Sequence, residues 1–189
     1  MSEPVSALSG AGDAAGFVTV REVGLRGMIS LRGDLALPQL RDVAVQLAGV
    51  QFPQIGQAHV SGGCGLCWMS PDELLILTHY VDAGAGVTAI TDALAGSHYL
   101  ATNVSDARAT FRLEGAHVRE ALAKLTPADV SSQAFPPGQI RRSRLAQAAA
   151  AFWMLDGQAG EVVCFRSVAD YVYGTLKNAA RAGSKVGYF

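Results

Sequence analysis

One hairpin pattern occurs twice in this chain, and no other feature limits the possible folds as strongly. The two stretches are CGLCWMSPDELLIL, from Cys64 to Leu77, and FWMLDGQAGEVVCF, from Phe152 to Phe165. In each, an apolar run that contains Trp-Met is broken by turn residues, and an acidic residue, Glu73 or Glu161, opens a second apolar run. Two apolar runs joined by a short turn predict a pair of antiparallel strands. The repeat therefore indicates two similar halves.

The segments around each hairpin follow the same plan. Alternation of apolar and polar residues predicts strands, and apolar residues three and four apart predict helices. Before residue 107 we expect strands over 17–23 and 28–34, a helix from Pro38 to a stop at Gly49, the hairpin, a helix ending at Gly96, and a strand over 99–106. After it we expect a strand over 108–115, a helix with a Glu120–Lys124 pair, a bend at 135–138, the second hairpin, and a helix capped by Ser167 with Asp170 as its capping-box partner.

This order predicts an α+β protein made of two ferredoxin-like β-α-β-β-α-β halves, each with two helices on one face of an antiparallel sheet. The predicted boundaries are a flexible N-terminal lead-in over residues 1–16, a first half over 17–106 and a second half over 107–189. The lead-in has no basic region followed by an apolar run, so it does not read as a secretory signal.

Composition limits the partners. The net charge is −1 without any basic block, which argues against nucleic acid and anionic membranes as partners. No apolar run reaches the roughly 18 residues that a membrane span needs. Three cysteines are too few for a disulfide framework, so a reducing, cytoplasmic location is expected. The chain has 12 Arg and 3 Lys. That excess suits a protein interface, but codon bias from a GC-rich genome explains it equally well.

The C-x-x-C of Cys64 and Cys67 is a candidate zinc or redox site. Zinc needs four ligands, and only His59 is near in sequence, while Cys164 is far along the chain. Redox chemistry needs the first Cys at a helix N-terminus, but this pair runs into a strand. Buried strand cysteines are the interpretation we favour.

A second candidate is GAGVTA, residues 84–89, which matches the G-x-G-x-x-A of a dinucleotide site and has Asp106 twenty residues beyond Gly86. That site requires a parallel β-α-β unit with the first Gly at the strand end. Here the preceding strand belongs to a hairpin and is antiparallel, so a nucleotide-binding enzyme is a minor alternative.

The remaining polar residues predict no catalytic, cofactor-binding or metal site, because the four His and the few Ser lack the spacing of known sites.

One strand predicts a surface that could contact a partner. In the strand RATFRLEG, Ala109, Phe111 and Leu113 alternate with Arg108, Thr110 and Arg112. Since the helices cover one sheet face, we expect Arg108, Thr110 and Arg112 on the other face. There they would meet the other half-sheet or a larger subunit, and our hypothesis is that this face contributes to assembly.

Several motifs, in order and from about Val18 to Arg181, resemble the gamma subunit of heterotetrameric sarcosine oxidase: VREVGLRGMISLRGD, WMSPDELLIL, NVSDARATFRLEGAHVREALAKLTPAD, FPPG, FWML and FRSVADYVYGTLKNAAR. The run LTPAD departs from the family's usual Cys-Pro-Leu-Asp-like run. The resemblance implies a fold similar to that of folate-binding aminomethyltransferases. It also implies alpha, beta and delta partner subunits in an enzyme that oxidises sarcosine to glycine, produces hydrogen peroxide and passes the one-carbon unit to tetrahydrofolate.

By the same resemblance, this chain carries no cofactor and no catalytic residue, while FAD, FMN, NAD, tetrahydrofolate and zinc belong to the partner subunits. An alternative is a free-standing folate-binding protein of the aminomethyltransferase type. Its Lys-Gly-Cys-Tyr and Gly-Gln-Glu signature is absent, and FPPGQIRRSRLAQ lies roughly where it should be.

Overall fold

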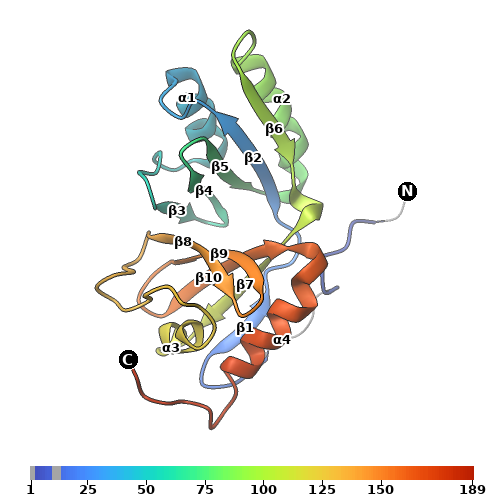
Figure 1. Cartoon of the computed structure of the whole chain (residues 1–189). Coiled ribbons are helices and arrows are strands. Elements are labelled where there is room, and N and C mark those ends of the chain that lie inside the picture. Colours follow the sequence, from blue (N-terminus) through green and yellow to red (C-terminus); the bar gives the residue numbers. More distant parts are fainter. Residues whose placement is uncertain (1–2, 10–13) are drawn as a thin grey trace. The chain divides into compact units, whose positions relative to one another are not determined.

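The computed structural model describes residues 3–9 and 14–189, which form two compact units (Figure 1). One unit is Leu25–Ser105, and the other combines the chain up to Gly24 with Asp106–Phe189. Each unit contains one five-stranded antiparallel sheet and two α-helices. The predicted α+β class and the ferredoxin-like plan are therefore confirmed. Among the described residues, no helix has the length and apolarity to cross a membrane.

The Leu25–Ser105 unit follows the order β2, α1, β3, β4, β5, α2, β6. The bounds are β2 (Gly27–Gly33), α1 (Pro38–Ala48), β3 (Ala58–Ser61), β4 (Cys64–Ser70), β5 (Glu73–Thr78), α2 (Ala83–Ala93) and β6 (Tyr99–Asn103). The sheet order is β3-β4-β5-β2-β6. Pro38 opens α1, and Gly49, with a φ of 64°, closes it in the left-handed conformation that glycine adopts without strain.

The second unit contains β1 (Thr19–Glu22), β7 (Arg108–Glu114), α3 (Val118–Ala123), β8 (Ile140–Leu145), β9 (Ala148–Met154), β10 (Ala159–Phe165) and α4 (Ala169–Ala179). Its sheet order is β1-β7-β10-β9-β8. In both units the hairpin strands, β4–β5 and β9–β10, are adjacent and antiparallel. The repeated sequence pattern thus corresponds to repeated topology.

The N-terminal strand differs from the expected domain boundary. We expected residues 17–23 to begin the first half, but β1 pairs with β7, with Val20 opposite Leu113. The reason is that β2, β4, β5 and β6 already complete one ferredoxin-like sheet, whereas the second half lacks its last strand. Val18 and Val20 are 1% and 0% exposed and complete the core of that second sheet.

The expected lead-in over residues 1–16 includes residues 1–2 and 10–13, which lie outside the described residues. Of those described, Ser6 Oγ donates to Glu22 Oε2 at 2.8 Å, and the Leu8 N–H donates to Glu22 Oε1 at 3.0 Å. Ala14 forms an isolated antiparallel bridge with Val20. These parts of the lead-in are therefore tied to β1.

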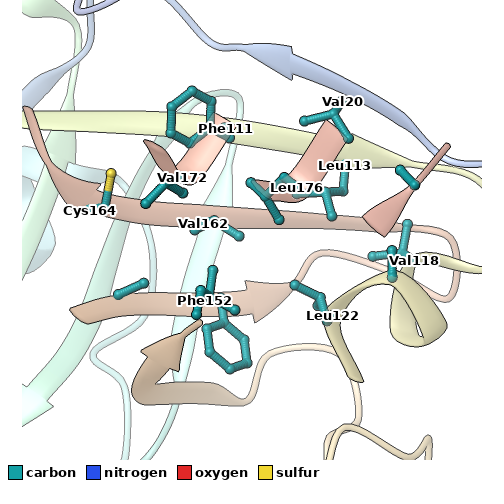
Figure 2. Close-up of a cluster of buried hydrophobic side chains, with 14 of the residues drawn as sticks. Val20, Phe111, Leu113, Val118, Leu122, Phe152, Val162, Cys164, Val172 and Leu176 are labelled. Atoms are coloured by element: carbon teal, nitrogen blue, oxygen red, sulfur yellow. The ribbon is translucent and has the colours of Figure 1, made fainter. Parts of the chain in front are cut away.

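Each unit has its own apolar core between sheet and helices. Figure 2 shows the core of the unit that contains β7, where Phe111 and Leu113 of the sheet face Val172 and Leu176 of α4. Phe111 is fully buried and stacks on Tyr173 with ring centroids 5.8 Å apart. Burial of a side chain of this size stabilises the fold by roughly 1.5–3 kcal/mol.

Two details of the sequence prediction differ from the structure, and the repeat is not exact. The extra edge strands β3 and β8 were not expected, because each is separated from its hairpin by a turn and lacks a distinct apolar pattern. The expected capping box of α4 is absent, since Ser167 lies in a 3-10 turn and the N-cap residue is Val168. Trp68 lies opposite Leu74 of the core, whereas Trp153 lies opposite Glu161 on the other side of its sheet. The two tryptophans therefore lie on equivalent strands, β4 and β9, but on opposite faces of their sheets.

Candidate functional site

The side of sheet β1-β7-β10-β9-β8 that faces away from α3 and α4 is called the outer face here. Ala109, Phe111 and Leu113 belong to the core, as the alternation predicted. In an extended strand, neighbouring side chains point to opposite sides. Arg108, Thr110 and Arg112 therefore lie together on the outer face, and the next question is what each of them contacts.

Arg112 is paired inside its own sheet. Its Nε donates to Glu114 Oε1 at 3.0 Å, and its Nη1 lies 3.5 Å from Glu161 Oε1. Glu161, on the neighbouring strand β10, is only 4% exposed. A buried carboxylate is stable as an anion only with a cation or hydrogen-bond donors nearby, so this arginine serves the fold first. Arg21 adds a more exposed contact to Glu114 at 3.8 Å.

The other unit has the same pair at the equivalent position. Arg32 of β2 lies opposite Glu73 of β5, just as Arg112 of β7 lies opposite Glu161 of β10. Arg32 Nη2 donates to Glu73 Oε2 at 3.0 Å, and this hydrogen bond, followed by the charge of Glu73, raises the pKa of the guanidinium. The acidic residue that opens the second arm of both hairpins is thus a structural counter-ion.

Arg108 and Thr110 have different surroundings from Arg112. The Arg108 guanidinium lies 4.0 Å from the ring centroid of Phe165, which is 49% exposed at the end of β10. Thr110 is 1% exposed, and its hydroxyl has no hydrogen-bond partner in the described part of the chain; the same holds for the indole N–H of Trp153. Among these side chains Phe165 is the most exposed, and the Arg108 guanidinium stacks on its ring. Phe165 was missed by sequence reasoning, although Glu161 and Val163, four and two residues earlier, lie on the same face of β10.

The structure separates the two thiols of the C-x-x-C. Cys64 and Cys67 are three residues apart within β4, so their side chains point to opposite faces of the sheet. Cys67 is fully buried and Cys64 is half-buried. Cys164 lies in the core of the other unit, where burial raises the pKa of its thiol to about 12. Residues 64 and 67 therefore cannot bind one metal ion together without rearrangement of the strand.

The glycines of GAGVTA lie inside a helix, and Gly86 serves helix packing. Strand β5 is antiparallel to both neighbours, and Gly84 and Gly86 lie within α2 rather than in a loop before it. A Cβ at Gly86 would lie 2.7 Å from Ile29 Cδ1. Glycine here lets the helix approach the sheet closely. The phosphate-binding turn of a dinucleotide fold requires a different backbone path, so this geometry contradicts the nucleotide-binding alternative.

The histidines are dispersed in the fold. His59 Nδ1 lies 2.8 Å from the Gln51 carbonyl oxygen, and His117 Nε2 lies 2.8 Å from Lys185 Nζ. Across residues 3–9 and 14–189, no three His, Cys, Asp or Glu side chains are arranged to hold a metal ion. The FPPG bend is also structural: Phe135 is fully buried and meets Phe152 edge to face at 5.7 Å.

Glu120 holds the end of the chain. It is 2% exposed, and its Oε1 and Oε2 accept the backbone N–H groups of Val186 and Gly187 at 2.5 and 3.1 Å. These hydrogen bonds, that of Val186 first, lower the pKa of the carboxyl group. Lys124 lies 3.8 Å from Glu120 and donates to the Ser184 carbonyl oxygen at 2.5 Å. The predicted Glu120–Lys124 pair is present, and both residues anchor residues 184–187.

Two ferredoxin-like units with these sheet orders define the fold class of the folate-binding aminomethyltransferases. Glycine cleavage system aminomethyltransferase T from Bartonella henselae matches with a TM-score of 0.63 and 15% identity, over 86% of this chain and 46% of that protein. A chain of heterotetrameric sarcosine oxidase from Corynebacterium sp. U-96, in complex with pyrrole 2-carboxylate, matches with a TM-score of 0.80 and 23% identity over 93% of both chains.

Residues 32–182 match the sarcosine oxidase, gamma subunit family. The chain belongs to this family, as the sequence motifs indicated. Among curated protein sequences, none matches this chain.

Proposed function

We propose that this chain is the non-catalytic gamma subunit of a cytoplasmic heterotetrameric sarcosine oxidase, with alpha, beta and delta subunits as its partners. The family match over residues 32–182 carries the proposal. In the complex, sarcosine is oxidised to glycine with production of hydrogen peroxide, and the one-carbon unit passes to tetrahydrofolate. The flavins, NAD, tetrahydrofolate and zinc are bound by the partner subunits.

The positions of the chemically active residues support a non-catalytic role. Cys64 and Cys67 lie on opposite sides of a strand, and the glycines of the nucleotide-like motif lie inside α2. Among the described residues, the most buried carboxylates are those of Glu120 and Glu161, and both contact other parts of this chain. These groups are engaged in the fold, so the role that fits the chain is assembly of a larger enzyme.

The surface that we propose to contribute to assembly is the outer face, which carries Arg108, Thr110 and Arg112. Its accessible portion centres on Arg108 and Phe165, because Thr110 is 1% exposed and Arg112 is paired with Glu161. Aromatic residues and arginine are both enriched in protein interfaces. We therefore expect Phe165→Ser to weaken assembly more than a substitution of Thr110.

Co-expression of the tagged chain with the three other subunits tests the proposal. We expect the tagged chain to retain all three, and the complex to produce hydrogen peroxide from sarcosine. The purified chain alone should bind neither flavin nor tetrahydrofolate. Tetrahydrofolate binding by the chain alone, measured by calorimetry, would instead support the free-standing aminomethyltransferase-like alternative. Failure of the chain to retain any subunit would refute the proposal.

A further inference from the structure

The four edge strands of the two sheets differ in how they are protected against pairing with another chain. An unprotected edge presents backbone N–H and C=O groups to any extended segment, and proteins block such edges with charge, short length or a covering segment. The outer edge of β1 is covered, because Ala14 and Val20 exchange hydrogen bonds of 2.9 and 3.1 Å. Strand β8 carries Arg141, Arg142 and Arg144, and β3 has only four residues.

Strand β6, with the sequence YLATN, has none of these protections. It lies at the edge of its sheet beside β2 (Figure 1), and its five residues include no charged residue and no proline. Leu100 is 58% exposed, whereas Tyr99 and Ala101 are partly buried and pack against the core of this unit. A protein that exists alone would be expected to guard such an edge.

The register shows which backbone groups of β6 face outward. The Val104 N–H donates to the Met28 carbonyl oxygen at 2.8 Å, which fixes 28 and 104 as a hydrogen-bonded pair. In an antiparallel ladder such pairs alternate with pairs that direct their N–H and C=O groups away from each other. The outward residues of β6 are therefore Tyr99, Ala101 and Asn103, and no backbone hydrogen bond to these outward groups is formed in the part of the chain that the structure describes.

We propose that β6 is the site at which an extended segment of a different subunit adds as a sixth strand to sheet β3-β4-β5-β2-β6. The proposal rests on the proposed role of the chain as an assembly subunit. The outward N–H and C=O groups of every second residue along β6 match the hydrogen-bonding groups of an extended strand, and of no other common backbone conformation. The added strand should be uncharged, with apolar side chains in phase with Tyr99 and Ala101, because those residues face the core.

A second copy of this chain is a weaker candidate for the occupant. Two β6 strands would contribute five residues each, with Leu100 as the one large exposed apolar side chain on each. Such a contact buries much less than the roughly 1,200 Å² of a stable interface. A larger, different subunit can add contacts beyond the strand itself.

Proline substitutions on the two edges of this one sheet give a matched test. Ala101→Pro removes an outward N–H from β6 and leaves the hydrogen bonds to β2 intact. Val60→Pro is the control on β3: the Trp68 N–H donates to the Gln57 carbonyl oxygen, so by alternation the Val60 N–H also faces outward. We expect Ala101→Pro to weaken capture of the other subunits by at least about tenfold, which corresponds to 1.4 kcal/mol, and Val60→Pro to leave it unchanged.

Amide hydrogen exchange on the parent protein gives an independent readout that needs no variant. In the isolated chain, the amides of Tyr99, Ala101 and Asn103 should exchange fast, while those of Leu100 and Thr102 are protected by β2. In the assembled complex, all five should be protected. Outward amides that stay fast in a complex containing all subunits would overturn the proposal, as would normal assembly of Ala101→Pro.

Two further outcomes separate the possible failures. If the parent chain captures no subunit at all, the proposed function fails before this inference is reached, and β6 as a site for another subunit falls with it. If the isolated chain is a dimer by light scattering and its outward β6 amides are already protected, the occupant is a second copy, and the proposal of a different subunit is wrong.

Discussion

Arg112 of β7 pairs with Glu161 of β10, with 3.5 Å between Nη1 and Oε1 and only 4% of the Glu161 side chain exposed. A carboxylate with so little exposure to water needs a cation or hydrogen-bond donors nearby, and the Arg112 guanidinium is such a cation. Arg112 thus stabilises the sheet in addition to forming part of the outer face, and the first prediction measures its contribution to stability.

Arg112→Glu should destabilise the isolated chain by about 2–5 kcal/mol, because it removes the cation and places a third carboxylate beside Glu114 and Glu161. Arg21→Glu is the control: its pair with Glu114 is long and more than a third exposed, so its loss should cost less than about 1 kcal/mol. Urea unfolding followed by circular dichroism measures both. Equal midpoints for Arg112→Glu and the parent would show that Glu161 does not depend on this pair.

The glycines of α2 give the second prediction. Gly84→Ala should raise the free energy of unfolding by about 0.5 kcal/mol, because a methyl group there meets no atom within 4 Å and alanine favours a helix. Gly86→Ala should lower it by about 1 kcal/mol, since its Cβ would lie 2.7 Å from Ile29 Cδ1. Thermal unfolding of the matched pair tests the packing role. A destabilised Gly84→Ala protein would indicate a special backbone requirement at that position.

The doubled hairpin allowed most of the fold to be predicted, because alternation and helical spacing depend on local sequence. The pairing of β1 with β7 could not be read from the sequence in the same way, since it depends on which sheet lacks a strand. The contact between Phe165 and Arg108 was missed for a related reason. Its partner, Arg108, lies 57 positions earlier in the sequence, and only the β7–β10 register brings the two together.

The candidate site shows the same limit. Alternation in RATFRLEG correctly placed Arg108, Thr110 and Arg112 on one side of the sheet, because side-chain direction in a strand is a local property. Alternation did not reveal that Arg112 forms an ion pair with Glu161 or that Thr110 is buried. Those facts depend on neighbouring strands. Glu73 and Glu161 were visible in the sequence as the acidic residues of the two hairpins, but only the register identified their arginine partners.

The third prediction concerns the thiols. In the folded chain at pH 8, iodoacetamide should modify the half-buried Cys64 first, while Cys67 and Cys164 react only after unfolding. For Cys164, a pKa of about 12 leaves about one thiol in ten thousand ionised at that pH. Mass spectrometry of native and denatured samples counts the labels. A disulfide between Cys64 and Cys67 in the folded chain would contradict their placement on opposite faces of β4.

The last prediction concerns the anchor of residues 184–187. The Glu120 carboxyl has a lowered pKa because the Val186 N–H, and then the Gly187 N–H, donate to it. A group with a lowered folded pKa contributes stability above its unfolded value, here 4.5, and that contribution is lost as the pH falls through the folded pKa. The anchor should therefore be complete at neutral pH and should be released in acid below pH 4.5.

Amide chemical shifts of Val186 and Gly187, followed by NMR from pH 7 downward, would show this release as a transition at the lowered pKa of Glu120. Glu120→Gln should reproduce the released state at neutral pH in part, because a neutral amide accepts a weaker hydrogen bond than a carboxylate does. Asp92→Asn, on the exposed side of α2 in the other unit, is the control and should leave the anchor unchanged. If the two amide shifts in Glu120→Gln match the parent from pH 7 to pH 3, Glu120 does not hold this segment, and the exposed rings of Tyr188 and Phe189 are positioned by other contacts.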